Sequence, residues 1–356
     1  MTRANEASRL VAEHLGGELT PLSELDEAWA TDSAGPRLRA VREGGRQLKR
    51  RLLAGEAVRA VKALPLARFP YPARFALGGS QWHPAPLVEM NHRALLVEFV
   101  QRGETKRLLF NPTDVEGARA TPFFAQLLAK IPAWLQPVVV AAPLPSLEAQ
   151  LAGLGVSVES IDYVAFDHFH TQDLRALFGR FPRARLLAPR REWDAWSQLH
   201  PVQSAWYVPG GNDGVDTSRV IFTERDVLLG DGVALVRTPG HTIGNQTLFV
   251  STTRGVWGCA ENGTCADAWS PAASGIAGLR RAAKVWGTEF ALNCNTPELY
   301  ADQYTSMALE SEVVDRVNAA PQFLQMYPSS ELCHSPLAPG LKPTFEHGVL
   351  EIGALS

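Results

Sequence analysis

The sequence predicts a layered α/β domain that follows a helical extension at the N-terminus. Short apolar runs rich in Val, Leu and Phe alternate with helical or loop segments from about residue 75 to about residue 317. This alternation is typical of β-sheets covered by helices. The chain has 356 residues, of which 46% are hydrophobic and 20% are charged. It can therefore bury a large core, in two domains or in one large one.

Residues 1–65 are expected to form the helical extension, and residues 66–356 the main domain. A basic stretch from Arg37 to Lys62 is interleaved with leucines at helical spacing. A basic run can bind nucleic acid or a membrane surface, but the interleaved leucines favour a helix that lies on the domain with a solvated basic face. The Pro-rich stretch 64–72 cannot be the interior of a helix, so it marks the entry to the main domain.

The main domain is expected to consist of two halves, each built from strands with intervening helices or loops. Apolar runs of the first half lie at 94–99, 107–110, 137–141 and 161–166. Runs of the second half lie at 220–222, 227–229, 233–236, 247–250 and 255–257. A helix at 276–285, a strand at 290–292 and a long helix from about 297 to about 317 are expected to follow.

Charge and cysteine content exclude several classes of protein. A formal charge of -3 and a pI near 6.3 give no overall attraction to nucleic acid or anionic lipid, so neither partner is expected. No apolar run approaches the roughly 18 residues of a membrane helix. The first residues are polar, unlike a signal peptide, so we expect a cytoplasmic protein whose four cysteines are free thiols. A homo-oligomer remains possible, because the leucines of the extension could pack on a second subunit.

The stretch from Asp167 to Asp173, Asp-His-Phe-His-Thr-Gln-Asp, is the most informative feature of the chain. Its two histidines, His168 and His170, follow an apolar strand and are separated by one residue. Two such side chains on a strand-end loop project toward one point, and His241 in a later Thr-Pro-Gly-His-Thr turn can complete a trigonal face. Neutral imidazoles bind zinc, iron and similar divalent ions, and three of them leave a position for water or substrate.

These motifs resemble the His-x-His-x-Asp-His signature and the later Gly-His-Thr turn of the metallo-β-lactamase-fold superfamily. The order of the expected strands and helices agrees with that superfamily. The resemblance implies a four-layer αββα sandwich with a metal cleft at one edge, and it implies a metal-dependent hydrolase that acts on a small molecule. His168, His170 and His241 match the three histidines of the superfamily's first metal site.

The second metal site of the superfamily is altered in this chain. Gln172 stands at the superfamily's Asp position, and Asp173 stands at its next His position. The superfamily has a metal-bridging carboxylate after the strand 255–257; Glu261 is our choice for it, and Cys259 is the rival because a thiolate also binds such metals. Cys294 stands where the superfamily has a Gly-His-Gly ligand. A mononuclear centre is therefore an alternative to a dinuclear one.

Each candidate of the altered site also has a purely structural interpretation. Asp173 could bind a second metal, or it could cap the helix that begins at the next residue. Glu261 could be a turn residue, and Cys294 could pack like a small hydrophobic side chain. His347, near the C-terminus, could fold over the cleft and supply a ligand or a proton, or it could be exposed. Gln172 is expected to hydrogen-bond within the cleft.

The primary hypothesis is a hydrolase with one or two zinc ions, which would lower the pKa of a bound water toward ~7 and polarise an ester, lactone, amide or phosphoester group. Asp173 or Glu261 would orient the water or shuttle its proton. A second hypothesis is an iron oxygenase centre of one or two ions, with His168, His241 and Glu261 as a two-histidine, one-carboxylate face. A third is a non-catalytic member that binds a ligand.

Aromatic residues near the expected cleft would suit a partly apolar substrate, although aromatic side chains near strands usually pack inward. They are Phe166, Phe169, Trp257, Trp269 and Trp82. His92 carries little positional information from the sequence alone.

Overall fold

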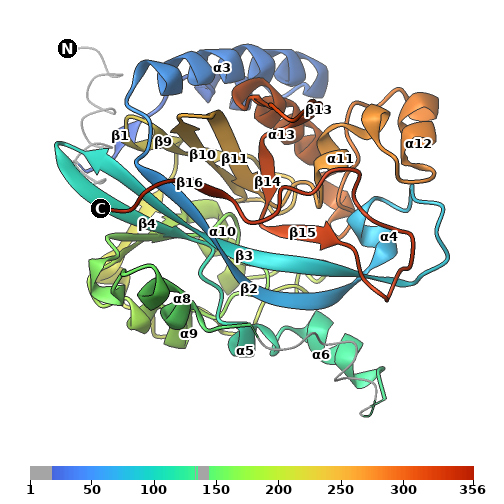
Figure 1. The fold of residues 1–356 in the computed structure, drawn as a ribbon, viewed down its shortest axis with the longest axis horizontal. Helices are drawn as coiled ribbons and strands as arrows, with labels where there is room; N and C mark the ends of the chain where they lie inside the picture. The colour runs from blue at the N-terminus through green and yellow to red at the C-terminus, as the bar shows by residue number, and fades with distance from the viewer. Residues whose placement is uncertain (1–17, 133, 135–143) are drawn as a thin grey trace.

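Two mixed β-sheets stacked face to face form the centre of the protein, and helices cover both outer faces (Figure 1). The structure is a computed structural model, and it describes residues 18–132, 134 and 144–356. The strand order is β1-β8-β9-β10-β11-β14 in one sheet and β16-β2-β3-β4-β5-β6-β7 in the other, where β15 also pairs with β3. The expected four-layer αββα arrangement is confirmed.

The strands of the six-stranded sheet are β1 (Thr20–Pro21), β8 (Val227–Gly230), β9 (Val233–Arg237), β10 (Gln246–Thr252), β11 (Gly255–Ala260) and β14 (Met326–Pro328). Those of the eight-stranded sheet are β2 (Ala60–Pro72), β3 (Leu87–Gln101), β4 (Glu104–Phe110), β5 (Tyr163–Ala165), β6 (Arg185–Pro189), β7 (Val220–Thr223), β15 (Ser330–Cys333) and β16 (Glu351–Gly353). A separate small ribbon joins β12 (Arg316–Val317) and β13 (Ala320–Leu324).

The helices are α2 (Asp26–Trp29), α3 (Ala34–Ala54), α4 (Ala73–Ala76), α5 (Val115–Ala118), α6 (Pro122–Ala129), α8 (Leu147–Gly153), α9 (Leu174–Leu177), α10 (Arg190–Ser197), α11 (Ala266–Trp269), α12 (Leu279–Trp286) and α13 (Tyr300–Val313). No helix in the described part of the chain is long and apolar enough to cross a bilayer.

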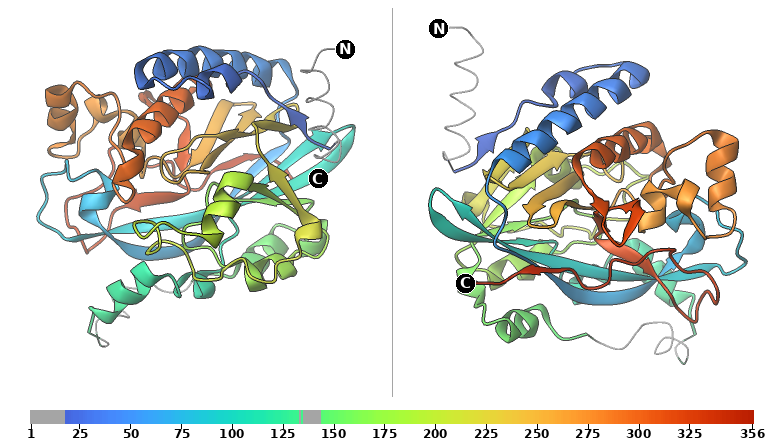
Figure 2. Two further views of the ribbon diagram at one scale, coloured as in Figure 1. Left: turned by 180° about the vertical axis from the view of Figure 1, so that it is seen from behind. Right: turned by 45° about the horizontal axis from the view of Figure 1, so that its top comes forward.

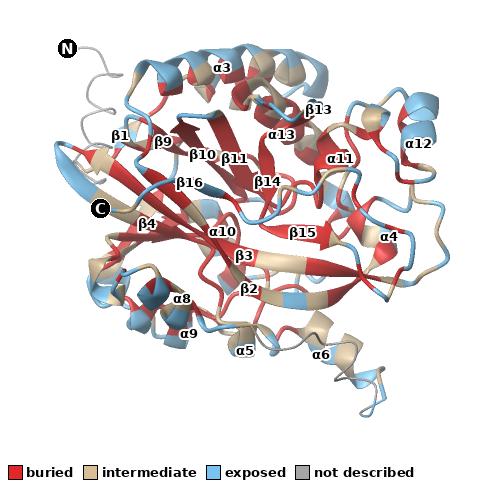
Figure 3. Ribbon diagram, in the orientation of Figure 1, coloured by how far each residue is buried: buried red, intermediate tan, exposed pale blue. Residues whose placement is uncertain are grey.

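The period-2 alternation of the strands builds two apolar layers. On β3, Leu95, Val97 and Phe99 face the six-stranded sheet and join a core that lies between the sheets. Their neighbours Ala94 and Leu96 face the outer helices. Because successive side chains of a strand point to opposite faces, the central strands are buried on both sides (Figure 3).

The N-terminal segment is shorter in helix than expected. Helix α3 ends at Ala54, and residues 60–65 already belong to strand β2. Helix α3 lies beside α13 over the six-stranded sheet (Figure 2), and its buried side chains include Leu48 and Leu52. Its basic residues are partly ion-paired, since Arg42 and Arg46 contact the carboxylate of Glu312. Most of the basic stretch is thus a helix that lies on the domain, as we expected. Nearby carboxylates offset part of its positive charge.

The Pro-rich stretch lies inside strand β2, although prolines cannot donate to a ladder. Strand β16 pairs only with residues 60–62 of β2, so the rest of that edge has no partner strand in the described part of the chain. Pro65 lies at the register shift between β2 and β3. Edge positions and bulges are the places where a strand accepts proline, because no backbone N–H is needed there.

Two expected strands are not found among the described elements. Residues 290–292 form a loop, in which Ala291 donates one backbone hydrogen bond to Ala268 without a ladder partner. The expected strand at 137–141 lies outside the described residues. The strands β12 to β16, which follow α13, were not predicted, and the helix expected to reach about residue 317 ends at Val313.

A buried ion pair ties the C-terminal segment to the sandwich. Arg93 on β3 pairs with Glu331 on β15, and their side chains are 1% and 6% exposed. The guanidinium group also lies 4.1 Å from the centre of the Tyr327 ring and donates to the Gly348 carbonyl at 3.0 Å. Removal of the carboxylate would leave a buried cation without its counter-charge.

We therefore expect Glu331→Ala to lower the free energy of unfolding by about 3–5 kcal/mol, as for other buried pairs that lose one partner. The control is Glu104→Ala, which breaks the pair with Lys106 at a carboxylate that is 73% exposed and should leave the free energy of unfolding nearly unchanged, because water screens an exposed pair. Urea denaturation measures both. Equal losses in the two variants would contradict the assignment of Arg93–Glu331 as a buried pair.

Candidate metal centre

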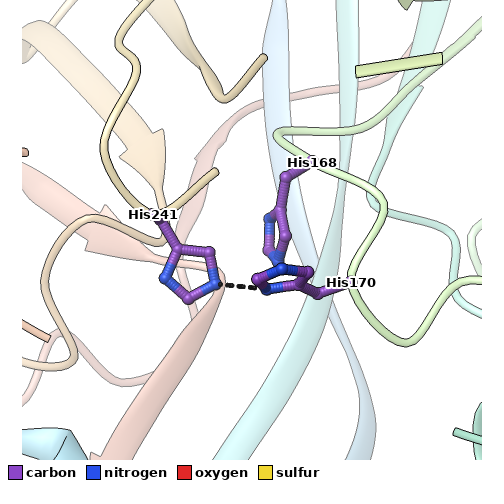
Figure 4. Close-up of side chains that lie close together, drawn as sticks. All are labelled: His168, His170 and His241. Atoms are coloured by element: carbon purple, nitrogen blue, oxygen red, sulfur yellow. Dashed lines mark hydrogen bonds between the residues drawn. The ribbon is translucent and has the colours of Figure 1, made fainter. Parts of the chain in front are cut away.

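Three histidines meet at one edge of the sandwich (Figure 4). His168 and His170 lie on the loop after β5, and His241 lies on the turn between β9 and β10. All three are buried, and one ring nitrogen from each lies within 4.8 Å of the others. Within the described residues, this is the one group of at least three His, Cys, Asp or Glu side chains that is close enough to hold a metal ion.

The spacing of the ring nitrogens fits a divalent metal ion. His170 Nδ1 lies 3.2 Å from His241 Nε2. Two ligands of a tetrahedral zinc ion, each bonded at about 2.0–2.1 Å, lie about 3.3 Å apart. The Asp167 carboxylate holds Nδ1 of His168 at 2.7 Å, so Nε2 of that ring is left free to bind a metal.

Electrostatics keep two of these rings in the form that binds metal. Burial lowers the pKa of His170 well below its usual 6.5, and the nearby His168 and His241 lower it further. Burial and His168 likewise lower the pKa of His241 well below 6.5. Both imidazoles are therefore neutral at neutral pH, as a metal ligand must be.

Glu192 on α10 ties together the two loops that carry the histidines. Its buried carboxylate accepts the backbone N–H of Phe169 at 3.0 Å on the first loop. On the second loop it accepts the Thr242 hydroxyl at 2.7 Å and the backbone N–H of Gly244 at 3.0 Å. The Tyr207 hydroxyl donates a fourth bond at 2.6 Å. One side chain thus sets the distance between His170 and His241.

Strained backbone and close packing also mark the site. Asn111 and Thr171 have positive φ angles of 58° and 61°. Asn tolerates this region, whereas a β-branched Thr adopts it at a cost of about 1–3 kcal/mol. Gly240, next to His241, has φ 150°, and a Cβ there would lie 2.2 Å from Cα of Gln303 on α13. Only glycine lets the His241 turn approach the helix this closely.

The three histidines open onto a cavity of about 650 Å³ with a polar end and an apolar end. The side chains that share the polar end with the histidines are His92, Thr113, Asp167, Gln172, Glu261, Asn295 and Ser330. The apolar lining comes from β2, β3 and the helices α5 and α6, and consists mainly of Phe69, Met90, Val115, Phe124, Leu127 and Leu128. Arg68, Glu116 and Arg119 also line the cavity.

Comparison with solved structures identifies the fold. A probable metal-dependent hydrolase from Staphylococcus aureus aligns with 70% of this chain and 83% of its own, at 13% identity and a TM-score of 0.50. The chain has the metallo-β-lactamase fold. Its three histidines lie at the edge of the αββα sandwich, where the sequence resemblance implied a metal cleft.

Two further structures align less well. AidC, a dizinc quorum-quenching lactonase solved with the product N-hexanoyl-L-homoserine, covers 85% of this chain and 96% of its own, at 12% identity and a TM-score of 0.49. The hydrolase AbOPH of the β-lactamase superfamily covers 85% of this chain and 98% of its own, at 13% identity and a TM-score of 0.44. No protein-family model matches the sequence. No curated protein matches it either.

Glu261, the candidate bridging carboxylate of the metallo-β-lactamase fold, lines the cavity but lies outside the compact histidine group. It is 6% exposed and accepts the backbone N–H of Ser330 at 2.8 Å. Burial and the negative charge of Asp167 raise its pKa well above 4.5. Cys259, its rival, is buried 3.7 Å from the hydroxyl of Ser329 and does not line the cavity.

The structure does not support the expected ligand roles of Asp173, Cys294 and His347. Asp173 caps α9 and pairs with Arg175 at 2.9 Å, so its carboxylate is already occupied. The Cys294 thiol, whose pKa is raised by burial, donates to the Leu292 carbonyl. None of the three lines the cavity or joins the described histidine group.

His347 packs instead among aromatic rings of the C-terminal segment. Its ring centroid lies 5.5 Å from Trp257, 5.8 Å from Tyr327 and 5.0 Å from Phe345. Burial lowers its pKa to about 3, so the ring is neutral. The ring therefore lies outside the cavity lining, among these aromatic side chains.

The aromatic residues that we expected around the cleft do not line it. Phe166, Phe169, Trp257 and Trp269 are core residues, and Trp82 is 63% exposed. The aromatic cavity residues are Phe69, Tyr71, Phe124 and Trp206. Sequence reasoning also missed Glu192 and His92. Neither stands in a motif, and only their contacts with distant loops reveal a role.

We expect protein purified without chelator to carry zinc, and His241→Ala to lose it, because two imidazoles alone bind a divalent ion far more weakly. Elemental mass spectrometry of the two proteins measures the metal content. The control is His83→Ala, a half-buried histidine that does not line the cavity. Full metal retention in His241→Ala would show that the site is elsewhere.

Glu192→Ala removes the common acceptor of four hydrogen bonds and should loosen both loops. Buried donors without an acceptor cost about 1–3 kcal/mol each, so we expect a loss of about 3 kcal/mol or more in unfolding free energy. Zinc affinity should fall about 10-fold to 100-fold, as for other supporting residues of metal sites. Thermal unfolding and zinc titration test this against Asp194→Ala, whose carboxylate on the same helix is 62% exposed. Parent-like zinc affinity in Glu192→Ala would rule out the clamp.

Proposed function

We propose that this chain is a metal-dependent hydrolase that cleaves a carbonyl or phosphoryl ester, a lactone or an amide in a small, partly apolar substrate. The observation that carries the proposal is the group of three buried histidines that opens onto a cavity with one polar and one apolar end. The metallo-β-lactamase fold is consistent with it. The Staphylococcus aureus protein that aligns with this fold is described as a probable metal-dependent hydrolase.

His168, His170 and His241 would hold the ion, and three nitrogen donors suit zinc. A zinc ion in such a site supplies Lewis acidity, which polarises a carbonyl or phosphoryl group and activates water. The chain's own contribution is to keep the imidazoles neutral and to fix their loops. Asp167 holds the His168 ring in one tautomer through the 2.7 Å bond to Nδ1.

Glu261 is the cavity residue best suited to move a proton. Its carboxyl group is buried at the polar end, where burial and Asp167 raise its pKa well above 4.5. A raised pKa makes a carboxyl group a better proton acceptor than an ordinary carboxylate, as a general base requires. We therefore assign general acid–base catalysis to Glu261. We do not assign it to Asp173, because that carboxylate pairs with Arg175.

The cavity walls favour a substrate with an uncharged reacting group and an apolar tail. The rings of Phe69 and Phe124 meet edge to face with centroids 5.3 Å apart at the apolar end. Two arginines line the cavity, and each is paired with a carboxylate: Arg68 with Glu89 and Arg119 with Glu116. Their charge is thus offset, which favours esters, lactones, amides and phosphotriesters over phosphate monoesters.

The test is a substrate panel with zinc-loaded protein: p-nitrophenyl acetate, butyrate and octanoate, an acyl-homoserine lactone, an anilide, a phosphotriester and p-nitrophenyl phosphate. We expect turnover of at least one neutral substrate and a loss of about 100-fold in kcat for Glu261→Gln, in line with lost acid–base catalysis. Asp173→Asn is the matched control and should retain turnover.

Other outcomes would decide between the alternatives. Iron in place of zinc, with oxygen uptake over the same panel, would favour an oxygenase. Metal retention without turnover of any compound would favour a ligand-binding protein. Equal activity of Glu261→Gln and the parent would remove Glu261 from the mechanism and leave the metal site untouched.

A further inference from the structure

His92 lies in the cavity wall between two hydroxyl groups. It stands on β3 directly opposite Ser330 on β15, and its Nδ1 lies 3.1 Å from the hydroxyl of Ser330. Its Nε2 lies 2.7 Å from the hydroxyl of Thr113. A hydroxyl group can donate or accept, so these two contacts alone leave the tautomer of His92 open.

Gln172 fixes the direction of these hydrogen bonds. Its amide nitrogen, which can only donate, lies 2.9 Å from the Thr113 hydroxyl. The Thr113 oxygen therefore accepts from Gln172 and has its own proton to give. His92 Nε2 is the nearer acceptor at 2.7 Å, compared with 3.5 Å for the Asn111 carbonyl. Because Nε2 accepts, the proton of the neutral ring is on Nδ1.

The same direction continues to Glu261. His92 Nδ1–H donates to the Ser330 oxygen, which frees the Ser330 proton for a further bond. Ser330 donates its backbone N–H to the Glu261 carboxyl group at 2.8 Å, and its hydroxyl acts on the same carboxyl group, whose pKa it lowers. The chain of donors thus runs from Gln172 through Thr113, His92 and Ser330 to Glu261. Burial lowers the pKa of His92 to about 4, which keeps the ring neutral in this chain.

We propose that His92 is a positioning residue: held in its Nδ1–H tautomer by Gln172 and Thr113, it directs the Ser330 hydroxyl toward Glu261 and so fixes the Glu261 carboxyl group in the cavity. The substitution at the superfamily's Asp position acquires a role in this way. An aspartate or glutamate at residue 172 would accept a hydrogen bond from the Thr113 hydroxyl and would reverse the direction of the chain. The link to catalysis rests on the proposed hydrolase function, whereas the assignment of the His92 tautomer is independent of that function.

The first experiment reads the tautomer in the absence of substrate and metal. Long-range ¹H–¹⁵N spectra of the chelator-treated, histidine-labelled protein distinguish Nδ1–H from Nε2–H, and the signals missing from His92→Gln assign the ring. We expect Nδ1–H in the parent and in Gln126→Glu, an exposed control on α6. In Gln172→Glu we expect a change to Nε2–H. An Nε2–H ring or an imidazolium in the parent at pH 7, or an unchanged tautomer in a folded Gln172→Glu, would overturn the proposal.

The second experiment asks whether the chain supports catalysis. On whichever panel substrate the zinc-loaded parent hydrolyses, Ser330→Ala and Gln172→Glu should lower kcat about 10-fold and change KM less than twofold, because they misplace Glu261 rather than the substrate. Zinc content should equal that of the parent. If no panel substrate is hydrolysed, the hydrolase proposal fails while the tautomer result stands. If both variants keep full kcat, the positioning role fails while the hydrolase proposal stands.

Discussion

The candidate site depends on one buried carboxylate. Glu192 accepts hydrogen bonds from both loops that carry the histidines. Neither loop contains a helix or strand that would hold its conformation. A buried carboxylate is costly to desolvate, so it is stable here because four donors surround it. The same bonds that offset this cost hold His170 and His241 at the spacing of two ligands of one ion. Stability and metal geometry therefore have a common origin.

Other buried acids support the site in the same way. The carboxylate of Glu310 on α13 accepts from Thr247, Asn262 and Trp269, each at 2.8 Å, and burial raises its pKa to about 7. Asn262 in turn accepts the backbone N–H of His241 at 3.2 Å. Burial opposes ionisation of Asp167, but His168 and hydrogen bonds from Ser329 and Asn111 lower its pKa overall. The metal face thus rests on prearranged polar groups rather than on apolar packing alone.

The cavity combines these polar groups with apolar side chains from β2, β3, α5 and α6. The histidines follow strands of both sheets, whereas Phe124, Leu127 and Leu128 lie on α6. Gln172 belongs to the polar end, where its amide nitrogen donates to the Thr113 hydroxyl at 2.9 Å. The wall beside the three histidines therefore consists of hydrogen-bonded side chains rather than of further members of the histidine group.

The sequence by itself determined the layered α/β class and the three histidines, because strand periodicity and strand-end histidines are local signals. The four-layer αββα arrangement was implied by the resemblance to the metallo-β-lactamase-fold superfamily. Only the tertiary structure brings His168 and His170, after β5 of one sheet, against His241, after β9 of the other. It did not determine which acids reach the cavity. Asp173 and Glu261 are equally polar in the sequence, yet Arg175 engages the first and Ser330, remote in the chain, holds the second. Glu192 and His92 emerged only in three dimensions, because a hydrogen-bond partner from a distant strand or loop leaves no periodic trace in the sequence.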